Sequence, residues 1–295
     1  MPAPVPGLPD QMLQHFGRDG LRRFGPADLQ SAHLPQEARE FLQETGVPES
    51  VAPYFRSPRP DQPTALGVTA ARLSQPAVPT EMYAWPRIGG DGLAHLCVRP
   101  DGAVHAVVLV DVCDDMFVSS NLATFCESMV ALDLAQPRFA ASSGLAEAAA
   151  VFRELKAELR RIDEQAFAER ENWWPRVLDD VRHTLNFPFS SAFEYVDASG
   201  AKQIVTEATG PGQLHPEEII WRRLSGSGVE ATQVRRVYCE LEPCLMPGHY
   251  CAVWLQETFP HAEFTHSFDY GDTAASREEG LKDLITRAAE QARRQ

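Results

Sequence analysis

The stretch His215-Pro216-Glu217, followed by Glu242-Pro243-Cys244 and then Cys251, decides how the second half of this sequence is interpreted. A catalytic zinc ion takes three protein ligands from His, Cys or carboxylate side chains and leaves a fourth position for water. The metal lowers the pKa of that water from about 16 towards about 7, and a carboxylate beside the metal can carry protons. We therefore predict that His215, Cys244 and Cys251 are metal ligands and that Glu217 is the catalytic proton carrier.

The spacing of the two cysteines leaves the last ligand open. Between Cys244 and Cys251, Pro247 indicates a loop and then a helix that begins near this proline. Cys251 is then expected one turn into the helix, where the positive end of the helix dipole favours a thiolate over a thiol. His249 and Cys239 remain alternatives for the last zinc ligand.

The elements around these residues follow a recognisable order. We expect strands over 187–196, 202–207, 233–241 and 262–270, and helices over 172–185, 216–224, 247–257 and 276–294. His215-Pro216-Glu217 opens one of these helices, and Glu240-Leu241-Glu242-Pro243-Cys244 ends the third strand. On these motifs, residues 172–295 resemble the cytidine deaminase-like superfamily, in the form found in bacterial polymorphic toxins and related to the AID/APOBEC group.

The resemblance implies a three-layer α/β domain and a zinc-dependent hydrolytic deaminase. Glu217 is expected to move protons to the ring nitrogen of a nucleobase and then to the departing ammonia. Cytosine is the favoured base, in single-stranded DNA, in RNA or as a free nucleotide. The family usually has two residues between its cysteines, whereas six separate Cys244 from Cys251 here.

The N-terminal part has a different pattern. A short helix is expected over 35–46, two Val-rich strands flank the turn Arg99-Pro100-Asp101-Gly102, a third strand covers 116–118, and Ser119-Ser120-Asn121 precedes a helix that reaches Leu132. With Gly89-Gly90-Asp91-Gly92, this α+β pattern resembles the SUKH superfamily of bacterial immunity proteins. That family binds partner proteins, often toxins, and has no shared catalytic residues, so none is assigned here.

These two resemblances predict the domain organisation. We expect a SUKH-like binding domain over 1–140, a helical linker over 141–171 and a deaminase-like domain over 172–295. Residues 135–144 have a linker composition, and 145–170 contain no Gly or Pro and are rich in helix formers. A role in bacterial toxin–immunity conflict is the expected context.

Charge and composition limit the partners. The net charge is -14, and residues 1–170 hold 15 Lys and Arg against 22 Asp and Glu, while 171–295 hold 12 against 19. Neither part is basic, which argues against tight non-specific binding to nucleic acid. The N-terminus does not resemble a signal peptide, and no apolar run is long enough to span a bilayer. We expect a cytoplasmic protein with reduced thiols and no membrane partner, with any delivery to other cells by a non-classical route.

Two alternatives stay open at this point. The deaminase-like half is either an enzyme or a zinc-stabilised scaffold in a non-catalytic immunity or adaptor protein, and Glu217 favours the enzyme because a scaffold does not require it. Trp221, Tyr250, Trp254 and Phe259 are candidates for stacking on a base. Aromatic residues at helical spacing more often belong to a hydrophobic core, which is the alternative for all four.

Overall fold

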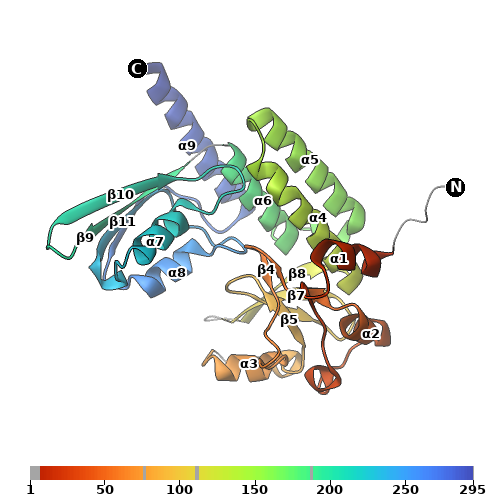
Figure 1. Ribbon diagram of the computed structural model, residues 1–295. Coiled ribbons are helices and arrows are strands. Elements are labelled where there is room, and N and C mark those ends of the chain that lie inside the picture. Colours follow the sequence, from red (N-terminus) through yellow and green to blue (C-terminus); the bar gives the residue numbers. More distant parts are fainter. Residues whose placement is uncertain (1–6, 76–77, 110–112, 187–188, 295) are drawn as a thin grey trace. The chain divides into compact units, whose positions relative to one another are not determined.

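The structure, a computed structural model, describes residues 7–75, 78–109, 113–186 and 189–294. The chain forms two compact units. Unit 1 consists of residues 1–137 and 153–177, and unit 2 of residues 138–152 and 178–295. Of the expected linker, residues 141–152 thus belong to unit 2 and residues 153–171 to unit 1. The division at residues 140 and 172 remains a prediction about sequence domains. Figure 1 shows the elements of both units.

An antiparallel sheet is the main strand structure of unit 1. It has the order β3-β4-β5-β6-β7-β8. Its strands are β3 (Ser50–Val51), β4 (Phe55–Arg56), β5 (Arg87–Gly90), β6 (His95–Val98), β7 (Val104–Leu109) and β8 (Cys113–Ser119), and a separate pair is formed by β1 (Leu21–Arg22) and β2 (Val47–Pro48). The predicted hairpin is confirmed by the pairing of β6 with β7 across a turn in which Gly102 has a φ of 91°. The expected strand end at Val110 lies outside the described residues.

The helices of unit 1 differ in how much they bury, from a single residue in α1 and in α2 to a continuous stripe in α4. They are α1 (Leu8–Phe16), α2 (Gln36–Glu44), α3 (Leu66–Arg72), most of α4 (Leu122–Ala140) and α5 (Leu145–Ile162), and the start of α6 (Trp173–Asn186). The predicted α4 stripe is confirmed, because Leu122, Phe125, Met129 and Leu132 are all buried. Asn121 is the cap, and its Oδ1 accepts a hydrogen bond from the Thr124 amide at 3.0 Å.

The ends of α4 and α5 differ from the sequence prediction. Helix α4 continues to Ala140 with Pro137 inside it, so 135–140 are helical rather than linker. Buried Ala135 and Phe139 continue its apolar stripe, which explains the extension. Helix α5 ends at Ile162 rather than near 170, because the next residue, Asp163, turns to accept hydrogen bonds from the Ser120 amide and hydroxyl.

Unit 2 contains a four-stranded sheet, and Cys239 lies on one of its strands. Its order is β10-β9-β11-β12, with strands β9 (Ser190–Val196), β10 (Lys202–Ala208), β11 (Val234–Leu241) and β12 (Glu263–Phe268). Strand β9 is antiparallel to β10 and β11, and β11 is parallel to β12. All four strands lie close to their predicted positions. The expected start of the first strand at Phe187 lies outside the described residues.

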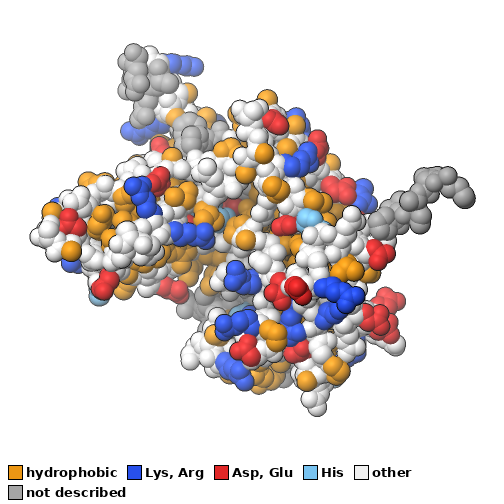
Figure 2. All heavy atoms as spheres, viewed as in Figure 1, with side chains coloured by type: hydrophobic (Ala, Val, Ile, Leu, Met, Phe, Trp, Pro, Cys, Tyr) orange, Lys and Arg blue, Asp and Glu red, His pale blue; other side chains and the backbone are white. Residues whose placement is uncertain are grey.

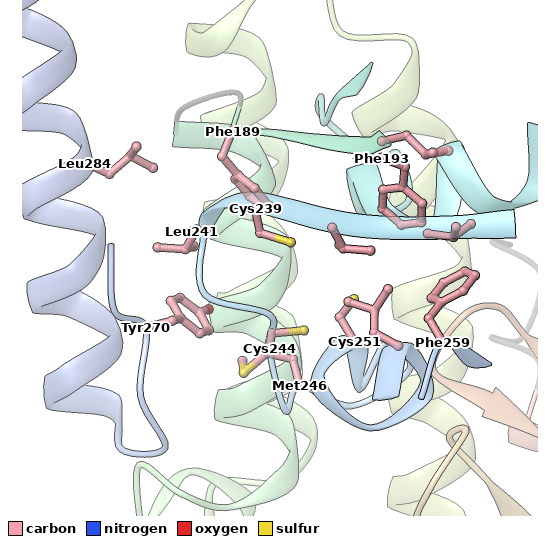
Figure 3. Packing of buried hydrophobic residues seen from close by; sticks show 14 of the residues in the cluster. Phe189, Phe193, Cys239, Leu241, Cys244, Met246, Cys251, Phe259, Tyr270 and Leu284 are labelled. Atoms are coloured by element: carbon pink, nitrogen blue, oxygen red, sulfur yellow. The ribbon is translucent and has the colours of Figure 1, made fainter. Parts of the chain in front are cut away.

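The helices of unit 2 are the last residues of α4, the first part of α5, the end of α6, α7 (Pro216–Gly226), α8 (Cys251–Thr258) and α9 (Ala274–Arg294). Helices α7 and α8 lie next to each other, with the Trp221 and Phe259 rings 4.9 Å apart (Figure 1). In Figure 3 the ring of Phe193 on β9 points towards Phe259, and Cys239, Cys244 and Cys251 belong to the same buried cluster. The core of unit 2 therefore surrounds the cysteines.

Helix α8 begins later than predicted. Its first residue is Cys251, whereas the sequence predicts a start near Pro247. Gly248 has a φ of 83° and Tyr250 a φ of 44°, and left-handed residues interrupt an α-helix. The chain instead makes a compact turn, closed by a 3.0 Å hydrogen bond from the Ala252 amide to the Cys244 carbonyl.

Both units mix helices and strands, as the α+β and α/β predictions require. Among the described residues, no helix is both long enough and apolar enough to cross a membrane.

Candidate metal centre and active-site pocket

The three predicted ligands come from three places in unit 2. His215 is the N-cap of α7, Cys251 is the first residue of α8, and Cys244 follows strand β11. His215 Nδ1 lies 3.5 Å from the Cys244 sulfur and 3.4 Å from the Cys251 sulfur. The three donor atoms lie within 4.8 Å of one another, and all three side chains are buried. We call these residues the thiol–imidazole group.

The pKa shifts place one thiolate beside one protonated imidazole in this group. Burial lowers the pKa of His215, but Cys244 and Asp180 raise it well above its usual value. Burial opposes ionisation of Cys244, but the Cys251 thiol and the His215 imidazole hold the pKa of Cys244 well below its usual value. Burial also raises the pKa of Cys251, and the neighbouring Cys244 raises it further. Two thiols and one imidazole are a donor set that zinc prefers, and three protein ligands leave one position open. The residues present therefore fit a zinc ion.

Glu217 lies in the first turn of α7 and is 2% exposed. The Ser191 hydroxyl on β9 donates a 2.5 Å hydrogen bond to its Oε1. Glu217, His215 and Cys244 line the same pocket. The structure therefore brings the predicted proton carrier to the predicted metal site.

The pocket is small and has polar and apolar walls. Its space is about 290 Å³ when the opening to solvent is included. Besides the site residues it is lined by Asp180, His183, Phe189, Leu241, Glu242, Pro243 and Tyr270. Glu242 has a structural contact here, because its Oε2 accepts hydrogen bonds from the amides of Tyr270 and Gly271 at 2.8 and 3.0 Å. The enclosed part of this space is only about 10 Å³, room for about one water molecule, so a nucleobase enters only if the pocket widens.

His183 offers an unused donor at this pocket. Its Nδ1 is hydrogen-bonded to the Tyr270 hydroxyl, and its Nε2 is buried and has no hydrogen-bond partner among the described residues. Burial, with help from Arg182, lowers the pKa of His183 to about 3 and keeps the ring neutral. Burial also raises the pKa of Tyr270, which keeps its proton. We assign the tyrosine as donor to Nδ1, so Nε2 carries the imidazole proton.

Neither of the two alternative ligands belongs to the thiol–imidazole group. Cys239 on β11 belongs to no group of candidate ligands among the described residues, and burial together with Glu217 raises the pKa of its thiol. His249 stacks on His215, with ring centroids 3.9 Å apart and an angle of 2° between the planes. Its two nitrogens face Asp180 and Glu218 rather than sulfur.

Sequence analysis did not single out Asp180, His183, Glu218 or Tyr270. Asp180 and His183 are one turn apart on a helix that was predicted, but nothing in the sequence places that helix against residue 215. Glu218 had a detectable signal, since it stands three positions after His215 and its Oε2 accepts a hydrogen bond from the His215 amide at 3.1 Å.

The four aromatic candidates for stacking on a base pack in or against the core of unit 2 instead. Trp221 and Trp254 pack edge-on against buried Phe259, and Tyr250 is buried at the start of α8. None of the four lines the described pocket. Near the site, Arg223 and Arg236 pair with Glu207 and Glu263 on the surface. On the face that Figure 2 shows, basic side chains are interspersed with acidic ones.

Comparisons with known families match both parts of the chain. Residues 8–180 match the SUKH-4 immunity protein family, and residues 188–287 match a Xanthomonas-like deaminase. Comparison with curated proteins and with solved structures finds no match. The first match covers more than half of the sequence. The chain therefore belongs to the SUKH-4 immunity protein family and carries a deaminase-family domain behind its SUKH domain.

Proposed function

We propose that unit 2 is a zinc-dependent hydrolytic deaminase that acts on a nucleobase, with cytosine as its base, and that it has the three-layer cytidine deaminase-like fold. The observation that carries the proposal is the meeting of the thiol–imidazole group and Glu217 in one pocket. In the proposal His215, Cys244 and Cys251 hold the zinc ion and Glu217 is the catalytic residue. When bound, the zinc supplies a Lewis acid that makes a water molecule nucleophilic near neutral pH.

Glu217 and Ser191 account for the proton steps. The carboxylate takes the proton that the attacking water loses and delivers it to the ring nitrogen beside the reacting carbon. It then passes a second proton from the added hydroxyl to the amine, which leaves as ammonia while a carbonyl forms. Ser191 holds Oε1 of Glu217 and leaves the second oxygen free of that bond. Burial at the pocket wall excludes bulk water from these transfers.

The unused donor on His183 supports cytosine over adenine. Cytosine carries a carbonyl oxygen next to the ring nitrogen that Glu217 protonates, whereas adenine has a C–H at that place. A neutral imidazole N–H complements a carbonyl oxygen. The Phe189 and Tyr270 side chains supply aromatic surface at the same pocket.

We further propose that unit 1 binds a protein partner, because SUKH-4 immunity proteins form the family that it matches. The pairing of an immunity domain with a deaminase domain supports a place in toxin–immunity conflict. The substrate is a single-stranded nucleic acid or a free nucleotide. Residues 171–295 hold 12 basic against 19 acidic side chains. This balance favours a substrate with few phosphate contacts over a long nucleic-acid duplex.

Deamination assays test this proposal. The zinc-loaded chain is incubated with single-stranded DNA, double-stranded DNA, RNA and free cytidine, and uracil or uridine is measured. Glu217→Ala is expected to lose about 10²- to 10⁴-fold in rate, the usual contribution of a general acid–base group, and to keep its zinc. Glu257→Gln, an exposed substitution on α8, is the matched control. Equal products from wild type and Glu217→Ala would remove the mechanism, and no product on any substrate would favour the non-catalytic immunity or adaptor role.

A further inference from the structure

Asp180 is a buried carboxylate, and burial of a carboxylate costs free energy. It lies on α6 next to the buried apolar residues Val181 and Leu178, and it is only 2% exposed. A buried carboxylate is stable only when charged or polar partners compensate for the lost water. Two imidazoles take that role. Oδ1 lies 3.1 Å from His215 Nε2, and Oδ2 lies 3.2 Å from His249 Nε2.

The contacts of Asp180 continue through Glu218 and return to His215. His249 Nδ1 donates to Glu218 Oε2 at 2.6 Å, and the same oxygen accepts the backbone amide of His215 at 3.1 Å. The His249 ring lies parallel to the His215 ring, at 3.9 Å between centroids. We call Asp180, His215, Glu218 and His249 the histidine–carboxylate network. It joins α6, α7 and the segment between the two cysteines.

This network orients the His215 imidazole, which lies against the two thiols. An imidazole that binds a metal through Nδ1 must carry its proton on Nε2, and a carboxylate at Nε2 fixes both that tautomer and the ring plane. His215 Nε2 has no aligned hydrogen-bond partner among the described residues, and the carboxylate oxygen that faces it belongs to Asp180. His249 adds a flat surface that blocks rotation of the His215 ring.

We propose that Asp180 and His249 are positioning residues for the metal ligand His215, and that the six residues between the cysteines form the segment that brings His249 into place. Gly248 and Tyr250 have left-handed backbones on either side of His249. For tyrosine this conformation has an energetic cost, which the stacked and doubly bonded His249 offsets. The inference rests on the proposed zinc site.

The test measures zinc affinity of the full chain by competition with a chromophoric chelator, without any substrate. Asp180→Ala is expected to bind zinc about 10- to 100-fold more weakly, the usual effect of losing a partner of a ligating histidine. Asp180→Asn keeps the shape and one acceptor, so a smaller loss is expected. Asp179→Asn is the matched control, because Asp179 is the neighbouring carboxylate and faces Arg182 and Arg277.

A second readout separates positioning from folding. In the cobalt-substituted protein, Asp180→Asn and His249→Phe are expected to shift the visible ligand-field bands while the thiolate-to-cobalt absorption stays. Unfolding curves show whether each variant is folded. If Asp180→Ala does not fold, Asp180→Asn replaces it in both measurements. Equal zinc affinity and equal spectra in Asp180→Asn, His249→Phe and Asp179→Asn would overturn the proposal.

Metal stoichiometry and activity complete the set of outcomes. Two zinc ions per wild-type chain, with one lost in Asp180→Ala, would make Asp180 and His249 ligands of a second ion and overturn the positioning role. Wild-type protein without zinc affinity would overturn it as well. The expected zinc pattern together with an inactive wild type would remove only the proposed deaminase function and leave the positioning role in place.

Discussion

Buried polar groups are used differently in the two units. In unit 1 several of them form separate pairs: Asp91 accepts a 2.8 Å hydrogen bond from the Trp173 indole, and His95 pairs with Gln75 at 2.8 Å. In unit 2 several of them gather around His215, where both nitrogens of His249 face carboxylates and Nε2 of His183 has no hydrogen-bond partner among the described residues. Separate hydrogen-bonded pairs stabilise a fold, whereas a cluster of ionisable groups indicates a reactive site. The difference supports the proposal that the chemistry lies in unit 2.

The largest effect is expected from the cysteines. Cys251→Ser should remove most of the bound zinc and lower the stability of unit 2, because the metal stabilises only the folded form. Cys239→Ser should keep one zinc ion per chain, since its thiol does not belong to the thiol–imidazole group. Atomic emission on dialysed protein measures both. Loss of zinc from the Cys239 variant and its retention in the Cys251 variant would reverse the ligand assignment.

The next effect concerns His183. His183→Phe should lower kcat/KM for cytosine by about tenfold, the equivalent of about 1.4 kcal/mol for one buried hydrogen bond. Zinc content should not change, because His183 is absent from the candidate ligand groups. Steady-state kinetics with a cytosine substrate provide the measurement. An unchanged kcat/KM in a folded, zinc-loaded variant would contradict the role of His183 in reading the base.

The comparison also predicts a pH dependence in both units. Burial lowers the pKa of His95 to about 4, with a smaller contribution from Arg87, and lowers that of His183 to about 3. Both rings are neutral in the folded protein and titrate near 6.5 when unfolded. The unfolded state therefore binds more protons below this pH, and stability that is complete above about pH 7 is lost as the pH falls towards 4.

Urea unfolding at pH 7 and pH 5 measures this effect. Each histidine should contribute about 1 to 2 kcal/mol to the loss. His95→Gln should flatten the pH dependence of unit 1 alone. A dependence that is the same with and without His95 would show that other groups dominate.

The smallest effect is confined to unit 1. Asp163→Ala removes acceptors for the Ser120 amide and hydroxyl, at 2.6 and 2.8 Å, and should cost about 1 kcal/mol of unfolding free energy. Glu164→Ala, an exposed neighbour, is the control. Zinc affinity should be the same in both variants. A zinc affinity that falls with Asp163→Ala would break the separation of roles between the units.

Sequence analysis predicted the elements better than it predicted their ends. The hairpin around Gly102 and the helix that follows His215 depend on local signals, namely turn residues, caps and apolar periodicity, and the structure has both. The extension of α4 to Ala140 depends on the burial of Phe139, and the late start of α8 depends on the turn before Cys251. Tertiary contacts decide both ends, and the sequence does not display them.

The residues of the candidate site also fall into two groups, those with local sequence signals and those that depend on tertiary contacts. His215, Glu217, Cys244 and Cys251 have short-range signatures and were predicted, and the structure brings them together. Asp180 and His183 contribute through contacts that join residues far apart in the chain, about 35 positions for Asp180 and His215. No periodicity or spacing encodes such a pairing.

The turn between the two cysteines has a consequence for how such proteins are found. A metal ion constrains the positions of the sulfur atoms that bind it. It does not constrain the number of residues between the two cysteines. Six residues here lead back to the start of α8 by way of Gly248 and Tyr250. Pattern searches that insist on a short interval between the thiols pass over centres of this kind, and a search that allows a variable interval with an internal histidine would recover them.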